Sequence, residues 1–311
     1  MSVAVITGAS GMLGQALIRY LLKRNDKIYA VVRPSSENNI KMLRDENVCF
    51  VECDLTNLTE LPQKIKESCD VFYHFGWSGT FGNTRNNLYG QLENVKYTLD
   101  AVNAAHELGC KVFLGAGSQA EFGRVPNHIK LSSKVLANPE TGYGIAKLTA
   151  GQMSRALCNE YGIKHVWTRI LSIYGPYDKP RSMVMSGIYS MLKGERPQYT
   201  KGEQMWDYLY CDDAANAFIS AAEKGEDGAI YCIGSGQVMP LRDYICKIRD
   251  VIDPNLELGF GEIPYYDKQV MYLCADISDL TKDTGFVPKI AFEEGIRKTV
   301  EWCRGEINAE T

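Results

Sequence analysis

The chain has 311 residues, of which 45% are hydrophobic and 23% are charged, and its formal net charge is −4. This composition is typical of a globular protein with a large core, and the charge excludes the basic footprint of a protein that binds nucleic acid or an anionic membrane. No apolar stretch is long enough to span a bilayer, and Met1 leads directly into the first predicted strand, so we expect a cytoplasmic protein.

Ten cysteines are scattered along the chain without a Cys-x2-Cys pair, and the four histidines form no pair at ligand spacing. We therefore expect reduced thiols in the core and no metal site.

The first predicted strand, residues 3–7, leads into the turn Thr7-Gly8-Ala9-Ser10-Gly11-Met12-Leu13-Gly14, and a helix opens at or just after Gly11. The unpaired amides and the dipole of a helix N-terminus form an anion site. Gly8 permits a tight turn, Gly11 lets a pyrophosphate approach the backbone, and Gly14 lets the helix pack close to the strand. This context predicts dinucleotide binding.

Strand and helix patterns alternate through the first half of the chain. Strands are predicted at 3–7, 27–32, 48–53, 71–75, 111–114 and 165–170, and helices at 12–23, 58–67, 88–108 and 143–161. This alternation predicts an α/β fold with a Rossmann-type, doubly wound parallel sheet, whose ligands lie beyond the carboxyl ends of the strands.

The end of the second strand indicates which dinucleotide binds. An acidic residue there would bind the ribose hydroxyls of NAD, but this chain has Val32 followed by Arg33-Pro34-Ser35-Ser36. A guanidinium and serine hydroxyls suit a 2′-phosphate, so we expect NADP, with NAD as the alternative. A solvated loop residue is the alternative interpretation of Arg33.

The third strand ends at Asp54 and Leu55, which we expect to contact the adenine amino group and to cover its ring. The alternative role of Asp54 is to cap the helix that follows.

The helix at 143–161 opens with Tyr143-Gly144-Ile145-Ala146-Lys147. Residues four apart share a helix face, so the Lys147 ammonium can approach the Tyr143 phenol and, with an oxidised nicotinamide, lower its pKa from about 10. Gly115-Ala116-Gly117-Ser118 follows the strand just upstream and places a hydroxyl at the same edge of the sheet. We expect Ser118 to hold a carbonyl or alcohol while Tyr143 transfers the proton. An ordinary amphipathic surface is the alternative explanation of the Tyr-x3-Lys pair.

After Tyr174-Gly175-Pro176 the alternation weakens. Helices are predicted at 182–193, 212–223, 241–251 and 292–304, and a strand at 229–233. We therefore expect a dinucleotide-binding domain at 1–172, with 207–235 returning to it, and a mainly substrate-binding lobe at 173–311.

These features resemble the extended short-chain dehydrogenase/reductase family, in its branch of NAD(P)-dependent sugar-nucleotide epimerases, dehydratases and ketoreductases. The resemblance covers nearly the whole chain through Thr7–Gly14, Asp54-Leu55, His74-Phe75-Gly76, Asn94, Ser118, Tyr143 with Lys147, Tyr174-Gly175-Pro176, Asp207 to Asp213 and Gly285-Phe286-Val287-Pro288. It implies that Ser118, Tyr143 and Lys147 are catalytic and that Lys147 also holds the nicotinamide ribose. It further implies a homodimer through helices 88–108 and 143–161.

The expected site follows from these motifs and from the strand ends. Its cofactor-binding residues are Gly8, Ser10, Gly11, Met12, Leu13, Gly14, Arg33, Asp54, Leu55, Phe75, Gly76, Trp77, Asn94, Tyr143, Lys147, Ile170 and Ile173. Its substrate-binding residues are Thr80, Gln119, Ser172 and Arg181.

Several departures from the family pattern narrow the expected reaction. Dehydratases of this family carry an Asp-Glu pair directly after the catalytic hydroxyl, where this chain has Gln119-Ala120, so dehydration is not expected. The family often has two arginines that help to hold a substrate diphosphate. Trp206 stands in place of the first, and residues 271–275 contain no arginine in place of the second. The family's usual asparagine before Tyr-Gly-Pro is also absent, because Ser172-Ile173 stands there. Lys179, Arg181 and Arg196 can replace the missing charges or be surface residues.

We expect an NADP-dependent reductase of a nucleoside-diphosphate deoxy-hexulose. The first alternative is an NAD-dependent sugar-nucleotide 4-epimerase, and the second is a regulator that senses dinucleotides without turnover. A sensor has no use for an acid/base triad, which argues against the last.

Overall fold

The structure is a computed structural model that describes residues 2–34, 43, 45–267 and 269–310. Seven strands form one sheet in the order β11-β6-β5-β4-β1-β2-β3. The strands are β1 (Val3–Thr7), β2 (Lys27–Val32), β3 (Val48–Glu52), β4 (Val71–His74), β5 (Val112–Ser118), β6 (Lys164–Ile170) and β11 (Ala229–Ile233). Every neighbouring pair is parallel, which confirms the predicted doubly wound sheet.

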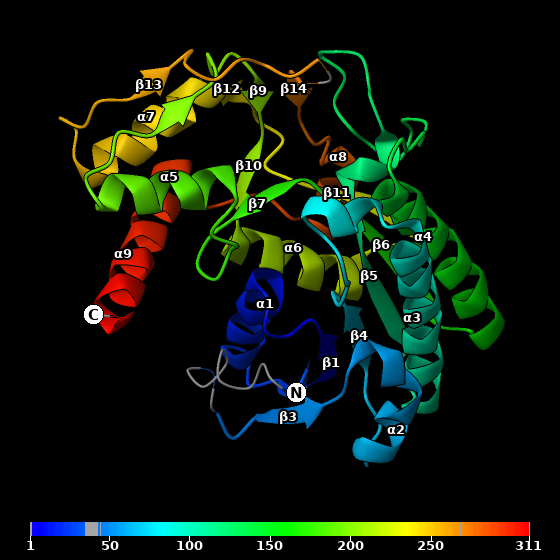
Figure 1. The fold of residues 1–311 in the computed structure, drawn as a ribbon. Helices are drawn as coiled ribbons and strands as arrows, with labels where there is room; N and C mark the ends of the chain where they lie inside the picture. Colours follow the sequence, from blue (N-terminus) through cyan, green and yellow to red (C-terminus); the bar gives the residue numbers. More distant parts are fainter. Residues whose placement is uncertain (1, 35–42, 44, 268, 311) are drawn as a thin grey trace.

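Helices cover both faces of this sheet (Figure 1). One face carries α1 (Met12–Leu22) and α6 (Cys211–Lys224), and the other carries α3 (Leu88–Glu107) and α4 (Gly142–Tyr161), which lie side by side. Alternate strand residues enter the two cores, so that Ile6 packs with α1 and α6 while Val5 packs with α3.

The chain reverses its winding between β1 and β4, which are neighbours in the sheet. At such a switch point a crevice opens beyond the carboxyl ends of the two strands. Here those ends lead into the Gly8 turn and the Phe75-Gly76 turn, and a Cβ on Gly8 would lie 2.8 Å from the Gly76 nitrogen. The close approach and the φ of 69° explain why glycine stands at position 8.

The helix expected at 292–304 continues to Glu310, and two further predicted elements differ from those observed. The strand expected at 111–114 continues to Ser118, and the helix expected at 58–67 is replaced by a 3-10 helix, η2 (Leu55–Glu60), and the short α2 (Leu61–Lys64). Gly115 and Gly117 lie within this strand and their role is packing, because a Cβ at either position would lie within 2.4 Å of the Trp167 ring. Pro62 lies in the first turn of α2, directly after Leu61, and so interrupts the helix expected across this segment.

The remaining chain builds a smaller lobe above the strand ends (Figure 1). Its helices are α5 (Met183–Leu192), α7 (Leu241–Ile252) and α9 (Phe292–Glu310), whereas α8 (Ser278–Thr284) packs on α6 and β11 of the large sheet. Its strands are β7 (Ser172–Tyr174), β8 (Gln198–Tyr199), β9 (Met205–Trp206), β10 (Tyr208–Tyr210), β12 (Met239–Pro240), β13 (Gly259–Phe260) and β14 (Tyr272–Leu273). The lobe has its own core, in which Met185, Ile188 and Val300 are buried.

Two buried aspartates connect the lobe to the sheet. Asp207 accepts hydrogen bonds from the backbone nitrogens of Ser235, Gly236 and Ala275, and so joins the start of β10 to the segment after β11. Asp213, in the first turn of α6, accepts from the backbone nitrogens of Lys289 and Ile290. Among the helices that the structure describes, none has the length and hydropathy needed to cross a membrane.

Candidate active site

The glycine turn after β1 has the features needed to hold a dinucleotide phosphate. Gly11 is the N-cap of α1 and provides no side-chain cap, so the first amides of the helix are left for another acceptor. A Cβ at Gly14 would lie 2.5 Å from the Gly8 carbonyl oxygen, whereas one at Gly11 meets only that oxygen, at 3.4 Å. Packing therefore requires glycine at position 14, while the space at Gly11 is open for a ligand.

A buried polar chain supports this turn from below. Thr7 Oγ1 accepts from the Gly76 nitrogen at 3.1 Å and lies 2.9 Å from His74 Nδ1, and His74 Nε2 lies 3.4 Å from Thr98 Oγ1. Burial, and secondarily the charge of Lys147, lowers the pKa of His74 to about 3. His74 is therefore neutral and links β1, β4 and α3.

The loop after β4 is held by α3. Asn94 accepts a hydrogen bond from the Ser78 nitrogen and donates to the Ser78 and Gly90 carbonyl oxygens, while the Trp77 indole donates to Gln91. Asn94 and Gln91 are buried, so their observed role is to shape the loop that carries Trp77 and Thr80. The predicted cofactor contact of Asn94 stays a prediction.

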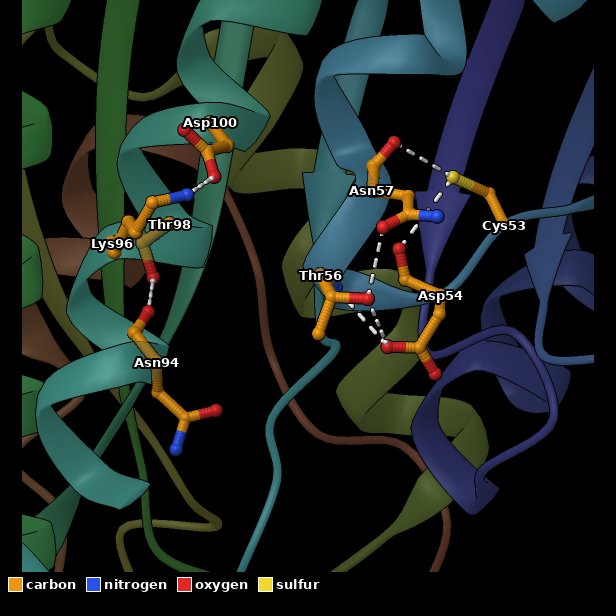
Figure 2. A network of polar contacts seen from close by, with 8 residues as sticks. All are labelled: Cys53, Asp54, Thr56, Asn57, Asn94, Lys96, Thr98 and Asp100. Carbon is orange, nitrogen blue, oxygen red and sulfur yellow. Dashed lines mark hydrogen bonds and ion pairs between the residues drawn. The ribbon is translucent and has the colours of Figure 1, made fainter. Parts of the chain in front are cut away.

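The adenine end of the expected site lies at the ends of β2 and β3. Asp54 is the N-cap of η2 and accepts from the backbone and the hydroxyl of Thr56, as Figure 2 shows. Leu55 packs on Gly76, where a Cβ would lie 2.6 Å from Leu55 Cδ2. Arg33 is exposed directly after β2, and the predicted contribution of Ser35 and Ser36 lies outside the described residues.

The other expected cofactor residues surround the same crevice. Met12 and Leu13 are the first residues of α1, and Ser10 lies in the turn before it. Phe75 directly follows β4, Ile170 is the last residue of β6, and Ile173 lies in β7. Leu13, Phe75, Ile170 and Ile173 are half-buried against one core cluster, so the side chains along this line of strand ends also have a packing role.

Ser118 and Tyr143 come together at the carboxyl edge of the sheet. Ser118 ends β5 and its hydroxyl accepts from the Ala120 nitrogen at 3.2 Å. Tyr143 lies in the first turn of α4, whose N-cap is Thr141. Burial raises the pKa of the Tyr143 phenol, and a hydrogen bond with Ser118 and the charge of Arg85 act in the opposite direction. The predicted pair is therefore within hydrogen-bonding reach.

Lys147 lies one turn along α4, and its ammonium is 5.8 Å from the centre of the Tyr143 ring. The ammonium donates to the Ala116 carbonyl oxygen and lies 3.6 Å from the centre of the Trp77 ring. Burial lowers the pKa of Lys147 to about 7, although the carboxylate of Glu121 raises it. Near neutral pH this side chain can therefore gain or lose its proton.

Glu121 is the residue that the sequence analysis missed. It has no exposed surface, and Oε1 accepts from the Ser118 nitrogen at 2.8 Å and from Trp167 Nε1 at 3.0 Å, while Oε2 pairs with Arg169 Nε at 2.7 Å. Ser118 and Glu121 form a capping box around the 3-10 helix η4 (Gln119–Phe122). The Ser-x-x-Glu spacing was the signal that could have identified it.

The expected substrate residues are spread around the mouth of the site. Thr80 accepts from Lys179 Nζ, which also lies 4.2 Å from the Phe81 ring centre, so the loops after β4 and β7 meet there. Ser172 accepts from the Trp206 indole at 2.8 Å, Gln119 is half-buried in η4, and Arg181 is exposed. Arg196 pairs instead with Glu262 in the lobe.

The described residues contain no group of three or more histidines, cysteines and acidic residues that could hold a metal ion. A glycine-lined anion site beside a serine, a tyrosine and a lysine defines a nucleotide-dependent oxidoreductase of the short-chain type.

The comparisons with known proteins agree with this class. The family model described as "NAD dependent epimerase/dehydratase family" matches residues 4–234, and the chain belongs to this family. It is an NAD(P)-dependent enzyme of the extended short-chain dehydrogenase/reductase type, in a family of sugar-nucleotide dehydratases, epimerases and reductases.

The relatives differ in their reactions. The chain is 29% identical over 320 residues to the trifunctional UDP-glucose 4,6-dehydratase/UDP-4-keto-6-deoxy-D-glucose 3,5-epimerase/UDP-4-keto-L-rhamnose-reductase of Arabidopsis thaliana, covering 96% of this chain and 46% of that protein. The chain thus spans about half the length of this relative. It is 24% identical over 341 residues to the dTDP-glucose 4,6-dehydratase of Shigella flexneri, covering 98% and 93% of the two chains.

Solved structures share the fold. The UDP-N-acetylglucosamine 4-epimerase of Methanobrevibacter ruminantium superposes with a TM-score of 0.87 at 23% identity, covering 98% of this chain and 99% of that chain.

The buried Lys147 makes stability depend on pH. The unfolded chain keeps the lysine proton up to about pH 10, while the folded chain loses it near pH 7, so stability rises with pH between these values. We expect Lys147→Met to reduce this rise, measured as the difference in unfolding free energy between pH 7 and pH 9 from urea titrations. Lys96→Met is the control, because Lys96 is exposed on α3 and pairs with Asp100 (Figure 2). An unchanged rise in Lys147→Met would contradict the argument.

Proposed function

We propose that the protein is an NADP-dependent reductase that acts on a keto group of a nucleoside-diphosphate deoxy-hexulose. The observation that supports this most is the grouping of Ser118, Tyr143 and Lys147 at the carboxyl edge of the sheet, with no ionisable side chain at positions 119 and 120. Solved structures with this fold contain NAD in some cases and NADPH in others.

The residues divide the reaction between them. The Gly11 turn would hold the cofactor pyrophosphate and Lys147 the nicotinamide ribose. The bound nicotinamide supplies the hydride. Ser118 donates a hydrogen bond to the carbonyl oxygen and fixes it beside Tyr143, whose hydroxyl proton passes to that oxygen as the alcohol forms. Lys147 lies behind the phenol and stabilises its anion when protonated.

The surroundings of Ser118 argue against dehydration, although relatives named above carry it out. Loss of water requires an acid and a base beside the reacting carbon, and Gln119 and Ala120 provide neither. The nearest carboxylate, Glu121, is fully buried and occupied by Ser118, Trp167 and Arg169. It is therefore held away from the substrate side.

A sugar-nucleotide 4-epimerase is the second candidate, favoured by the overall similarity to an epimerase structure. An epimerase oxidises and reduces one carbon in turn and so retains its cofactor, whereas a reductase consumes it. The exposed Arg33 after β2 favours the reductase, because NADPH is the usual reductant that carries a 2′-phosphate.

Removal of the phenol hydroxyl tests the proposed chemistry. We expect Tyr143→Phe to lower kcat for a nucleoside-diphosphate 4-keto-6-deoxyhexose by roughly 10²–10⁴-fold with little change in the dissociation constant of NADPH. Tyr97→Phe is the matched control, because Tyr97 is a half-buried tyrosine on α3, and this variant is expected to keep the activity of the wild type. Near-normal turnover by Tyr143→Phe would rule out the assigned proton donor.

The cofactor preference tests the role of Arg33. A charge-assisted contact with the 2′-phosphate contributes roughly 1.5–3 kcal/mol, so we expect NADPH to bind at least about tenfold more tightly than NADH. Arg33→Ala is expected to weaken NADPH binding alone, measured by fluorescence titration of both cofactors. Equal weakening of both, or protein that purifies with NAD bound, would favour the epimerase.

We propose a homodimer as the functional assembly, but with a corrected interface. The sequence suggests that apolar residues of α3 and small residues of α4 form this interface. Several of them are buried in the subunit itself, namely Val95 and Val102 of α3 and Gly144, Ala146, Ala150 and Gly151 of α4. The glycines let α4 approach its own sheet, since a Cβ on Gly151 would lie 2.7 Å from the Trp167 ring. The exposed apolar residues of the two helices are Leu88, Tyr89 and Leu92 on α3 and Ile145 and Met153 on α4.

Sedimentation velocity tests this interface. Leu92 is 61% exposed and Ile145 is 51% exposed, so introducing charge there removes apolar area from the interface without disturbing the core. We expect a dimer at micromolar concentration that Leu92→Glu converts to monomer. Leu136→Glu, at an exposed loop position outside both helices, serves as the control. A wild-type protein that sediments only as a monomer would rule the dimer out.

A further inference from the structure

Arg85 lies against the face of Tyr143 and was not among the expected site residues. Its guanidinium carbon is 4.5 Å from the centre of the phenol ring. Trp77 packs edge-on against the same ring, with ring centres 6.0 Å apart. The phenol is thus flanked by an aromatic ring and a cation.

Of the two cations beside the Tyr143 ring, Arg85 lies closer than Lys147, the cation that the sequence predicts there. Lys147 Nζ lies 5.8 Å from the ring centre, compared with 4.5 Å for Arg85, and it is directed to the Ala116 carbonyl oxygen and the Trp77 ring. Arg85 comes from a different element, the 3-10 helix η3 (Gly82–Asn86) between β4 and α3. The two cations therefore approach Tyr143 from different elements, Arg85 from η3 and Lys147 from α4.

We propose that Arg85 is a positioning residue for the proposed reaction, which acts through Tyr143 and stabilises its phenolate from the face of the ring. The inference rests on the proposed function, in which Tyr143 is the proton donor. As the Tyr143 O–H bond breaks, the proton forms the O–H bond of the product alcohol and leaves a phenolate. A proton from solvent then restores the phenol.

The charges around Tyr143 explain why a cation besides Lys147 is needed to stabilise the phenolate. Burial disfavours the phenolate most strongly, and the carboxylate of Glu121 disfavours it further. Lys147 is itself held at a pKa of about 7, so it carries only part of a positive charge near neutral pH. An arginine side chain keeps its charge at every pH in which a protein is stable. Arg85 thus provides the constant part of the field, and its charge acts to lower the pKa of Tyr143.

The attraction between a cation and the face of an aromatic ring becomes stronger as the electron density of the ring increases. The phenolate ring is more electron-rich than the phenol ring, so the guanidinium binds the ionised form more strongly. Arg85 therefore acts in the same direction as Ser118, whose hydrogen bond also lowers the pKa of Tyr143.

The titration of Tyr143 can be measured directly. The protein is labelled with 3-fluorotyrosine, and the ¹⁹F resonance of Tyr143 is assigned from its absence in Tyr143→Phe. The midpoint is then followed with pH in the cofactor-free protein. We expect Arg85→Met to raise the midpoint by about one pH unit and Arg85→Lys to raise it by less. The pH profile of kcat is expected to move in the same direction.

Arg124→Met is the matched control, because Arg124 is exposed and pairs with Glu140. It makes the same change of net charge and is expected to leave the midpoint unchanged. A midpoint in Arg85→Met equal to that of the wild type would overturn the proposal, and so would an equal shift in Arg124→Met. Because Arg85 is half-exposed, Arg85→Gln provides a second neutral variant for the same titration. The titration tests Arg85 even if Tyr143→Phe proves active, so the two proposals can fail separately.

Discussion

The active site depends on one buried carboxylate, that of Glu121. It binds the Ser118 backbone, the Trp167 indole and the Arg169 guanidinium with distances of 2.7–3.0 Å. A buried charge is costly unless its hydrogen-bonding capacity is used, so the three donors and the carboxylate hold one another in a single arrangement. The arrangement joins the end of β5 to β6 and fixes the backbone that carries the Ser118 hydroxyl.

The same cluster positions the helix that carries Tyr143 and Lys147, the other two groups of the proposed triad. Trp167 fills the space over Gly115 and Gly117 on β5 and over Gly151 on α4, so α4 can approach the sheet only because glycine stands at these positions. Tyr143 and Lys147 project from the first turns of this helix. Packing and charge therefore act together, because the carboxylate that fixes Ser118 also raises the pKa values of both Tyr143 and Lys147.

Local patterns were sufficient to predict most of the fold and to single out Ser118, Tyr143 and Lys147, whose catalytic roles stay predictions. The Gly8 to Gly14 turn, the strand and helix periodicities and the Tyr143–Lys147 spacing all depend on residues close in sequence. The errors concern contacts between distant residues. The strand continues through Gly115 and Gly117 because Trp167, some fifty residues later, packs on them. Arg85 approaches Tyr143 from another element. Gly144 and Gly151 indicated a partner helix, but both pack within their own subunit, Gly144 on the Ala120 backbone and Gly151 on the Trp167 ring.

The central claim is that the protein transfers a hydride to a keto sugar and consumes its cofactor. The direct test is incubation of a nucleoside-diphosphate 4-keto-6-deoxyhexose with NADPH deuterated at the transferring position, followed by mass spectrometry of the sugar nucleotide. The account predicts one deuterium on the product carbon and one cofactor oxidised for each product formed, in the wild type and not in Tyr143→Phe. Interconversion of sugar epimers without net oxidation of the cofactor would contradict it.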